Sequence, residues 1–215
     1  MASPNNQTTL ETITGRFINL VDPNPSDICL IDIAWSLSRL ARFNGHTINT
    51  IPYSVAQHSI VVANESANLA AKYYQDQFQG YVLTPPEVAR WKLIGLTHDA
   101  SEAYTGDVSG PLKKIPEFRP IIKTIEKKIQ DAILEALGLL PLNDIEEQIV
   151  KAADVLAQRI EAYNFMVSRG QNWSNSPEVS ILKLQEFEMP LNSSIVYERF
   201  LEMFNTEKSK FDYMQ

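Results

Sequence analysis

Apolar residues recur at helical spacing along most of this chain, and the pattern predicts an almost entirely α-helical fold. In the segment 117–137, Ile122, Ile125, Ile129 and Ile133 follow one another at intervals of three or four residues, which places them on one face of a helix. The same reasoning predicts helices over residues 28–43, 54–75, 84–104, 117–137, 143–169 and 193–205.

The start signals of three of these helices are well defined. Thr84 offers a capping hydroxyl, Pro85 stands at the first helical position and Glu87 at the third. Ser54 and Asn143 are the expected caps of the helices that follow them. Two segments outside the helical pattern, 15–25 and 46–52, look extended, and we expect them to pair as a short β-ribbon near the N-terminus.

The length of the chain favours one domain. Its 215 residues, 44% of them hydrophobic, suffice for one ordinary core. We therefore expect a single all-α helical bundle over residues 1–215, with a catalytic core at about 28–170 and a C-terminal part, 171–215, made of a loop (171–191) and a helix.

Composition points to a cytoplasmic protein. No apolar run approaches the ~18 residues that span a bilayer, and the first residues have neither the basic nor the apolar region of a secretory signal. The single cysteine, Cys29, cannot form an internal disulfide, and its apolar neighbours predict a buried thiol.

Charge argues against a surface that binds long nucleic acids. The formal net charge is −7, whereas such a surface needs clustered positive charge. Two regions depart from this average: 33–64 contains no carboxylate, and 104–128 carries six Lys or Arg against three acidic residues. Either region suits a compact polyanion such as a nucleotide phosphate, although ordinary surface variation would also explain them.

Candidate chemistry centres on His98, Asp99 and Glu102. The preceding residues 93–96 are apolar, which predicts a helix buried on all sides, with the His-Asp pair near its end. A buried carboxylate is costly unless it is paired or bound to a metal. The three side chains recur at helical spacing, and an imidazole with carboxylates suits a divalent cation.

Further ligands must come from elsewhere in the chain. Asp154 lies on a helix that is apolar on both sides, which predicts a carboxylate in a dry place; its alternative role is a buried Asp satisfied by the backbone or a nearby Arg. His58 also has apolar neighbours, and its alternative role is a satisfied core residue. His46, in a loop after a glycine, is a weaker ligand candidate, and we assign it no role.

These motifs, taken in order, resemble a known family. The stretches concerned are 53–59 (YSVAQHS), 98–113 (HDASEAYTGDVSGPLK) and Asp154. They are similar to the HD-domain superfamily of metal-dependent phosphohydrolases, and most similar to bacterial 5′-deoxynucleotidases and phage enzymes that remove triphosphate from dATP. The resemblance covers about 42–161, more than half of the chain.

The resemblance implies a role for each matching residue. The metal ligands would be His58, His98, Asp99 and Asp154. Glu102 matches the position that handles the proton of the attacking water, and Asp107 an acid near the leaving oxygen or the sugar. Arg42 and Lys113 match phosphate-binding positions. Lys114 could reach further phosphates, and Phe43 could stack on a base where the family commonly has Trp.

The implied function is hydrolysis of (deoxy)nucleotides at the 5′ position by a metal-activated water. One alternative is a dNTP or dATP triphosphohydrolase, and another is a non-catalytic helical module that binds a nucleotide or a protein. We expect one divalent ion (Mn, Co, Zn, Fe, Ni or Mg), with room for a second carried by the substrate phosphates. We also expect a homodimer or larger homo-oligomer with no membrane or long nucleic-acid partner.

Overall fold

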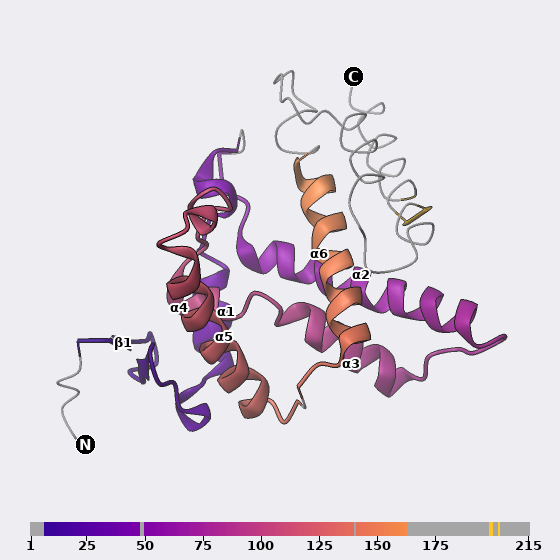
Figure 1. Ribbon diagram of the computed structural model, residues 1–215, viewed down its shortest axis with the longest axis horizontal. Coiled ribbons are helices and arrows are strands. Elements are labelled where there is room, and N and C mark those ends of the chain that lie inside the picture. The colour runs from indigo at the N-terminus through magenta and orange to yellow at the C-terminus, as the bar shows by residue number, and fades with distance from the viewer. Residues whose placement is uncertain (1–6, 48–49, 140, 163–197, 200–201, 203–215) are drawn as a thin grey trace. The chain divides into compact units, whose positions relative to one another are not determined.

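The computed structural model describes residues 7–47, 50–139, 141–162, 198–199 and 202, and in this part the chain is mostly helical (Figure 1). The predicted all-α class is confirmed. The principal helices are α1 (Leu30–Leu37), α2 (Val55–Gln77), α3 (Pro85–Leu96), α4 (Glu102–Thr105), α5 (Arg119–Ala136) and α6 (Asp144–Ala162). Short 3₁₀ turns occur at η1 (Pro25–Asp27), η2 (Arg42–Gly45) and η3 (Leu112–Lys114).

The chain divides into two compact units, each assembled from separated stretches of sequence. The first unit comprises Met1–His46, Pro52–Gln57 and Thr97–Pro141, and the second comprises Thr47–Ile51, His58–Leu96 and Leu142–Gln215. Helices α1, α4 and α5 belong to the first unit, and α3, α6 and most of α2 to the second.

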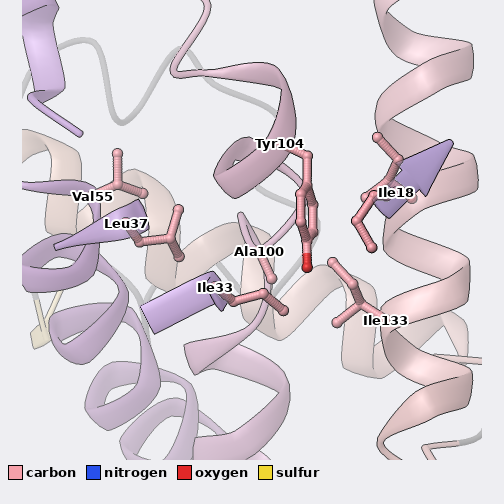
Figure 2. Close-up of a cluster of buried hydrophobic side chains, with 8 residues drawn as sticks. Ile18, Ile33, Leu37, Val55, Ala100, Tyr104 and Ile133 are labelled. Atoms are coloured by element: carbon pink, nitrogen blue, oxygen red, sulfur yellow. The ribbon is translucent and has the colours of Figure 1, made fainter. Parts of the chain in front are cut away.

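The first unit is built around a cluster of buried side chains from α1, α4, α5 and β2 (Figure 2). The Tyr104 ring lies among Ile18, Ile33 and Ile133, which come from segments far apart in the sequence. A hydrogen bond from Ser36 Oγ to the Ala103 carbonyl (2.8 Å) also ties α1 to α4. This core supports the turn that carries His98 and Asp99, because Ala100 belongs to the cluster.

The β-ribbon exists, but one of the two predicted strands is wrong. β1 (Thr9–Glu11) pairs antiparallel with β2 (Phe17–Asn19). Gly15 supplies a positive φ of 78° in the turn between them. The residues described within 46–52 form no strand. A strand close in sequence costs less loop-closure entropy than a distant one, and this favours β1 as the partner.

The predicted helix starts are confirmed. Thr84 Oγ1 and its N–H both donate to Glu87 Oε2 (2.6 and 2.7 Å) at the start of α3. At α6, Asn143 Oδ1 accepts the N–H of Glu146 (3.0 Å), and Glu146 Oε2 accepts the N–H of Asn143 (3.0 Å). Ser54 Oγ accepts a backbone N–H from the first turn of α2 (3.3 Å). The side chains of Glu87, Asn143, Glu146 and Ser54 each accept an N–H that a helix start leaves open. The Thr84 hydroxyl, predicted as the cap, instead donates to Glu87.

Two helices end earlier than predicted. The third was expected to reach residue 104, but α3 ends at Leu96 and a turn over 97–101 precedes α4. Gln130 of α5 explains the break: its Nε2 donates to the Thr97 carbonyl (2.7 Å), and its Oε1 accepts the Ser101 N–H (3.3 Å). His98 and Asp99 therefore lie in a turn and not in a helix. Leu96 is 41% exposed, so the expectation of a helix buried on all sides is also wrong.

The first predicted helix, 28–43, is shortened to α1. Past its end, the Leu40 carbonyl accepts the Val55 N–H (2.9 Å), and Ala41 forms an isolated β-bridge with Ser54. These contacts with a distant segment replace the hydrogen bonds of a continued helix. Cys29 precedes α1 and is only half-buried, so the prediction of a buried thiol is wrong.

The second unit packs α3 closely against α2. A Cβ added at Gly95 would lie 2.9 Å from both the Val62 carbonyl oxygen and the Ala63 Cα. Arg90 of α3 pairs with Glu146 of α6 (2.8 Å). The end of the predicted 143–169 helix beyond Ala162, the 171–191 loop and most of the 193–205 helix lie outside the described residues. None of the described helices combines the length and apolar character needed to cross a bilayer.

Candidate metal centre and its surroundings

His58 and Asp154 come together in the second unit. His58 lies in the first turns of α2 and is completely buried, whereas Asp154 lies midway along α6. His58 Nε2 is 3.3 Å from Asp154 Oδ1. On its other side, His58 Nδ1 is 2.7 Å from Oε1 of Glu161, a buried residue near the end of α6.

This arrangement fixes the tautomer of His58. A carboxylate only accepts hydrogen bonds, so at 2.7 Å Glu161 places a proton on Nδ1. In the neutral ring, Nε2 is then an acceptor, and it faces a second acceptor, Asp154 Oδ1, at 3.3 Å. Two facing acceptors need a proton or a cation between them. The donor set therefore fits a divalent metal, with Glu161 orienting the imidazole from behind.

Glu161 was not predicted, although a signal existed. It follows Asp154 by seven residues, which is two helical turns and therefore the same face of α6. The helical position predicted for Asp154 therefore implied that an acidic residue seven positions later would lie on the same side of the helix.

Asp154 is more exposed to solvent than predicted. Its side chain is 21% exposed, and Lys151 Nζ lies 2.7 Å from its Oδ2. The expectation of a carboxylate in a dry place is wrong for part of the side chain, because one edge of α6 at this turn faces solvent and carries Lys151. The apolar flanks are confirmed: Ala153 and Ala157 are fully buried.

The first unit holds His98 and Asp99 in the turn after α3. His98 Nε2 lies 3.0 Å from Asp99 Oδ2, and Arg42 Nη1 lies 3.8 Å from the same oxygen. The side chains of His98 and Asp99 are 9% and 27% exposed. The four predicted ligands thus form two His-Asp pairs, one in each unit.

Arg42 is presented by a strained turn. Its N–H donates to the Tyr53 carbonyl (2.8 Å), and the residue is only 6% exposed. Phe43 and Asn44 then both adopt positive φ, 55° and 52°, which non-glycine residues rarely do. Such strain persists only where the surrounding structure enforces it. The turn directs the Arg42 guanidinium towards Asp99 and keeps it 5.5 Å from the Phe43 ring centre.

Glu102 is a buried acid whose pKa is raised to about 8. Burial is the main cause, followed by the negative charges of Asp99 and Asp107, while Lys113 and Arg42 act in the opposite direction. Among the described residues, its Oε2 has no hydrogen-bond partner. Such a carboxyl group can bind and release a proton near neutral pH.

Lys113 lies between two carboxylates. Its Nζ is 3.4 Å from Glu102 Oε1 and 2.9 Å from Glu126 Oε1 of α5. Burial alone would lower the pKa of Lys113, but its contact with Glu126 and the charge of Glu102 outweigh this and raise it. Glu126 was not predicted, because no local pattern links α5 to η3.

The remaining predicted residues all belong to the first unit. Asp107 follows Gly106, whose φ of 80° ends α4, and is half-buried. Lys114 is exposed on η3, Phe43 is half-buried in η2, and His46 is exposed where η2 ends.

Sequence comparison finds a matching family and several relatives. The family described as 5′-deoxynucleotidase YfbR-like matches residues 32–205. The uncharacterized protein YfdR of Escherichia coli K12 is 31% identical over 196 residues, which cover 91% of this chain and 93% of YfdR. The 5′-deoxynucleotidase YfbR of Shigella boydii is 33% identical over 135 residues, 56% of this chain and 65% of that protein.

Solved structures share the fold. The cyanophage S-2L HD phosphohydrolase DatZ, solved with dA and one catalytic Zn²⁺ ion, has a TM-score of 0.55 at 18% identity and covers 85% of this chain and 98% of its own. A conserved hypothetical protein from Pyrococcus furiosus has a TM-score of 0.54 at 26% identity, covering 82% and 98%. Since the family match extends over most of the sequence and includes every predicted ligand, the chain belongs to the YfbR-like 5′-deoxynucleotidase family of HD-type phosphohydrolases.

Proposed function

We propose that this protein hydrolyses the 5′-phosphate of deoxynucleoside monophosphates and that His58, His98, Asp99 and Asp154 hold one divalent ion for the reaction. The observation that carries the proposal is the pair of acceptors formed by His58 Nε2 and Asp154 Oδ1 at 3.3 Å. The second His-Asp pair, at 98–99, supplies the same two ligand types. A set of two imidazoles and two carboxylates suits Mn, Co, Fe, Zn or Ni.

The bound ion would supply Lewis acidity, which activates a water and polarises the phosphoryl group. Side chains of the protein would carry out the proton transfers. Glu102 would accept a proton from the attacking water, since its pKa of about 8 is close to working pH and its Oε2 has no protein partner among the described residues. Asp107 would protonate the leaving 5′-oxygen or bind the sugar.

Positive charge for the phosphate would come from Arg42. Its guanidinium is buried, so its interaction with a phosphoryl oxygen would be less screened than at the surface. The turn that holds it also presents Phe43, which could stack on the base of the nucleotide. Positioning and charge neutralisation are the main requirements of phosphoryl transfer.

The second candidate function is release of triphosphate from a dNTP. The observation that favours it is that Lys113 and the exposed Lys114 are consecutive residues of η3, since two neighbouring ammonium groups suit a longer polyphosphate. Under this alternative the same ligands and Glu102 would act at the α-phosphate.

One assay separates the candidates. Deoxynucleoside mono- and triphosphates are incubated with the protein and each of Mn²⁺, Co²⁺, Zn²⁺ and Mg²⁺, and the released phosphate or triphosphate is identified by chromatography. We expect orthophosphate from dNMPs and loss of turnover in Asp154→Asn, with Glu147→Gln, an exposed change on α6, as the control. Hydrolysis that persists after chelation and in Asp154→Asn would overturn the proposal.

We further propose a homo-oligomeric protein of the cytoplasm. Its single cysteine agrees with a reducing compartment. Light scattering after size exclusion would give the oligomeric state directly, and a monomer at working concentration would reject that part of the proposal.

A further inference from the structure

Lys113 is held on both sides by acidic side chains from different elements of the first unit. Glu102 belongs to α4, Lys113 to η3 and Glu126 to α5. The Nζ–Oε1 distances are 2.9 Å to Glu126 and 3.4 Å to Glu102. The shorter contact is with Glu126, so the ammonium is anchored to α5 and reaches Glu102 from there.

Burial strengthens the interactions among these three charged side chains. The side chains of Glu102, Glu126 and Lys113 are 6%, 19% and 33% exposed, so these charges are screened much less than those of a surface pair. Lys113 has a flexible four-carbon stem and would otherwise sample many positions. Glu126 restricts it to one, beside Glu102 Oε1, while Glu102 Oε2 remains unpartnered in the described part of the chain.

We propose that Glu126 is a positioning residue for the reaction: it holds Lys113 against one oxygen of Glu102, so that the carboxyl group has a fixed orientation and offers its other oxygen to the water. This inference rests on the proposed function, because it assigns a purpose to Glu102 only if Glu102 handles the proton. It also gives Lys113 a role that does not require contact with the substrate phosphate.

The charge environment of Glu102 gives the expected direction of change. Asp99 and Asp107 disfavour its ionised form, whereas Lys113 and Arg42 favour it. Loss of Glu126 would release Lys113 from Glu102 and remove one of the two favourable charges. Glu102 would then ionise at higher pH and lose its fixed orientation.

The test compares Glu126→Gln, Lys113→Met and the double variant with the full-length, metal-loaded wild type. Glu135→Gln, an exposed change on the same helix, is the matched control. We expect Glu126→Gln to lower kcat about tenfold or more, to leave KM within about twofold, and to move the acidic limb of the kcat/KM profile to higher pH. The double variant should be no slower than Lys113→Met, because both changes break one arrangement.

Three results would overturn the inference: wild-type kcat in Glu126→Gln, a rise in KM alone, or losses that multiply in the double variant. A rise in KM alone would assign Lys113 to substrate binding. These failures are distinct from failure of the proposed function, in which the wild type and Glu135→Gln would hydrolyse no nucleotide with any metal, and that result would overturn both.

Discussion

At the scale of single residues, the candidate site contains several buried ionisable side chains. Glu102, Arg42, His58 and Glu161 are each at least 94% buried, although burial of an ionisable side chain is costly. Each has a charged or hydrogen-bonding neighbour that offsets the cost in part. At Glu102 the offset is incomplete, because burial and the charges of Asp99 and Asp107 raise its pKa to about 8.

Glu102 should make the metal-free protein less stable as pH rises. The pKa is 4.5 for an ordinary Glu and about 8 in the fold, so between these values the folded protein holds one more proton than the unfolded chain. Stability therefore falls across this window. Glu102→Gln removes the effect and should be more stable than the wild type at pH 8.5, on the order of 3 kcal/mol, with little difference at pH 4.

Urea unfolding in the presence of a chelator, measured at several pH values, checks this expectation. Glu135→Gln should retain the wild-type slope. A parallel pH dependence in Glu102→Gln and the wild type would assign the titration to another group.

Glu161 should control metal affinity through His58. Glu161→Gln can present an amide N–H to Nδ1 and reverse the tautomer, which would place a proton on Nε2, the atom that faces Asp154. We expect a 10- to 100-fold weaker Kd for the metal. Competition with a chromophoric chelator measures it without any turnover assay. Glu147→Gln is the control on the same helix, and an unchanged Kd would remove Glu161 from the metal environment.

At the scale of helices, the starts were predictable and the ends were not. Capping is local: Thr84 with Glu87, and Asn143 with Glu146, lie three residues apart and are visible in the sequence. The end of α3 depends on Gln130, which lies far along the chain and donates to the Thr97 carbonyl. No periodicity around residue 97 contains that information.

The contact of α3 with α2 should be intolerant of any side chain at Gly95. A methyl group there would approach backbone atoms of Val62 and Ala63 to 2.9 Å, closer than Cβ atoms normally come. Because backbone cannot move aside like a flexible side chain, Gly95→Ala should destabilise the protein by about 1–3 kcal/mol despite the better helix propensity of Ala.

Chemical denaturation of Gly95→Ala, compared with Ala136→Gly at the exposed end of α5, would measure this cost. The control loses propensity without any clash. A stability equal to or above that of the wild type in Gly95→Ala would mean that α2 and α3 can separate slightly at no cost.

At the scale of the whole molecule, the sequence predicted the fold class and the helical segments, and it named the four residues that the structure arranges as two His-Asp pairs. These depend on periodicity and on motifs, which are properties of neighbouring residues. It did not reveal Glu126, Glu161 or the strained pair Phe43 and Asn44. Their roles arise from contacts between distant segments, or from a backbone conformation that the surrounding structure imposes.

The bidentate pairing of Arg199 with Glu65 has a practical consequence for anyone who wishes to shorten the chain. Arg199 Nε and Nη2 donate to the two carboxylate oxygens at 2.6 and 2.8 Å, and Glu65 on α2 is only 6% exposed. A protein that stops after Ala162 would deprive Glu65 of its bidentate partner, leaving the Asn68 amide (3.2 Å) as a donor among the described residues, and should lose about 3–5 kcal/mol. The shortened form should recover much of that loss when Glu65 is also replaced by Met, and thermal melts of the two shortened versions would measure the recovery. Equal melting temperatures of these two versions would mean that Glu65 without Arg199 does not destabilise the protein.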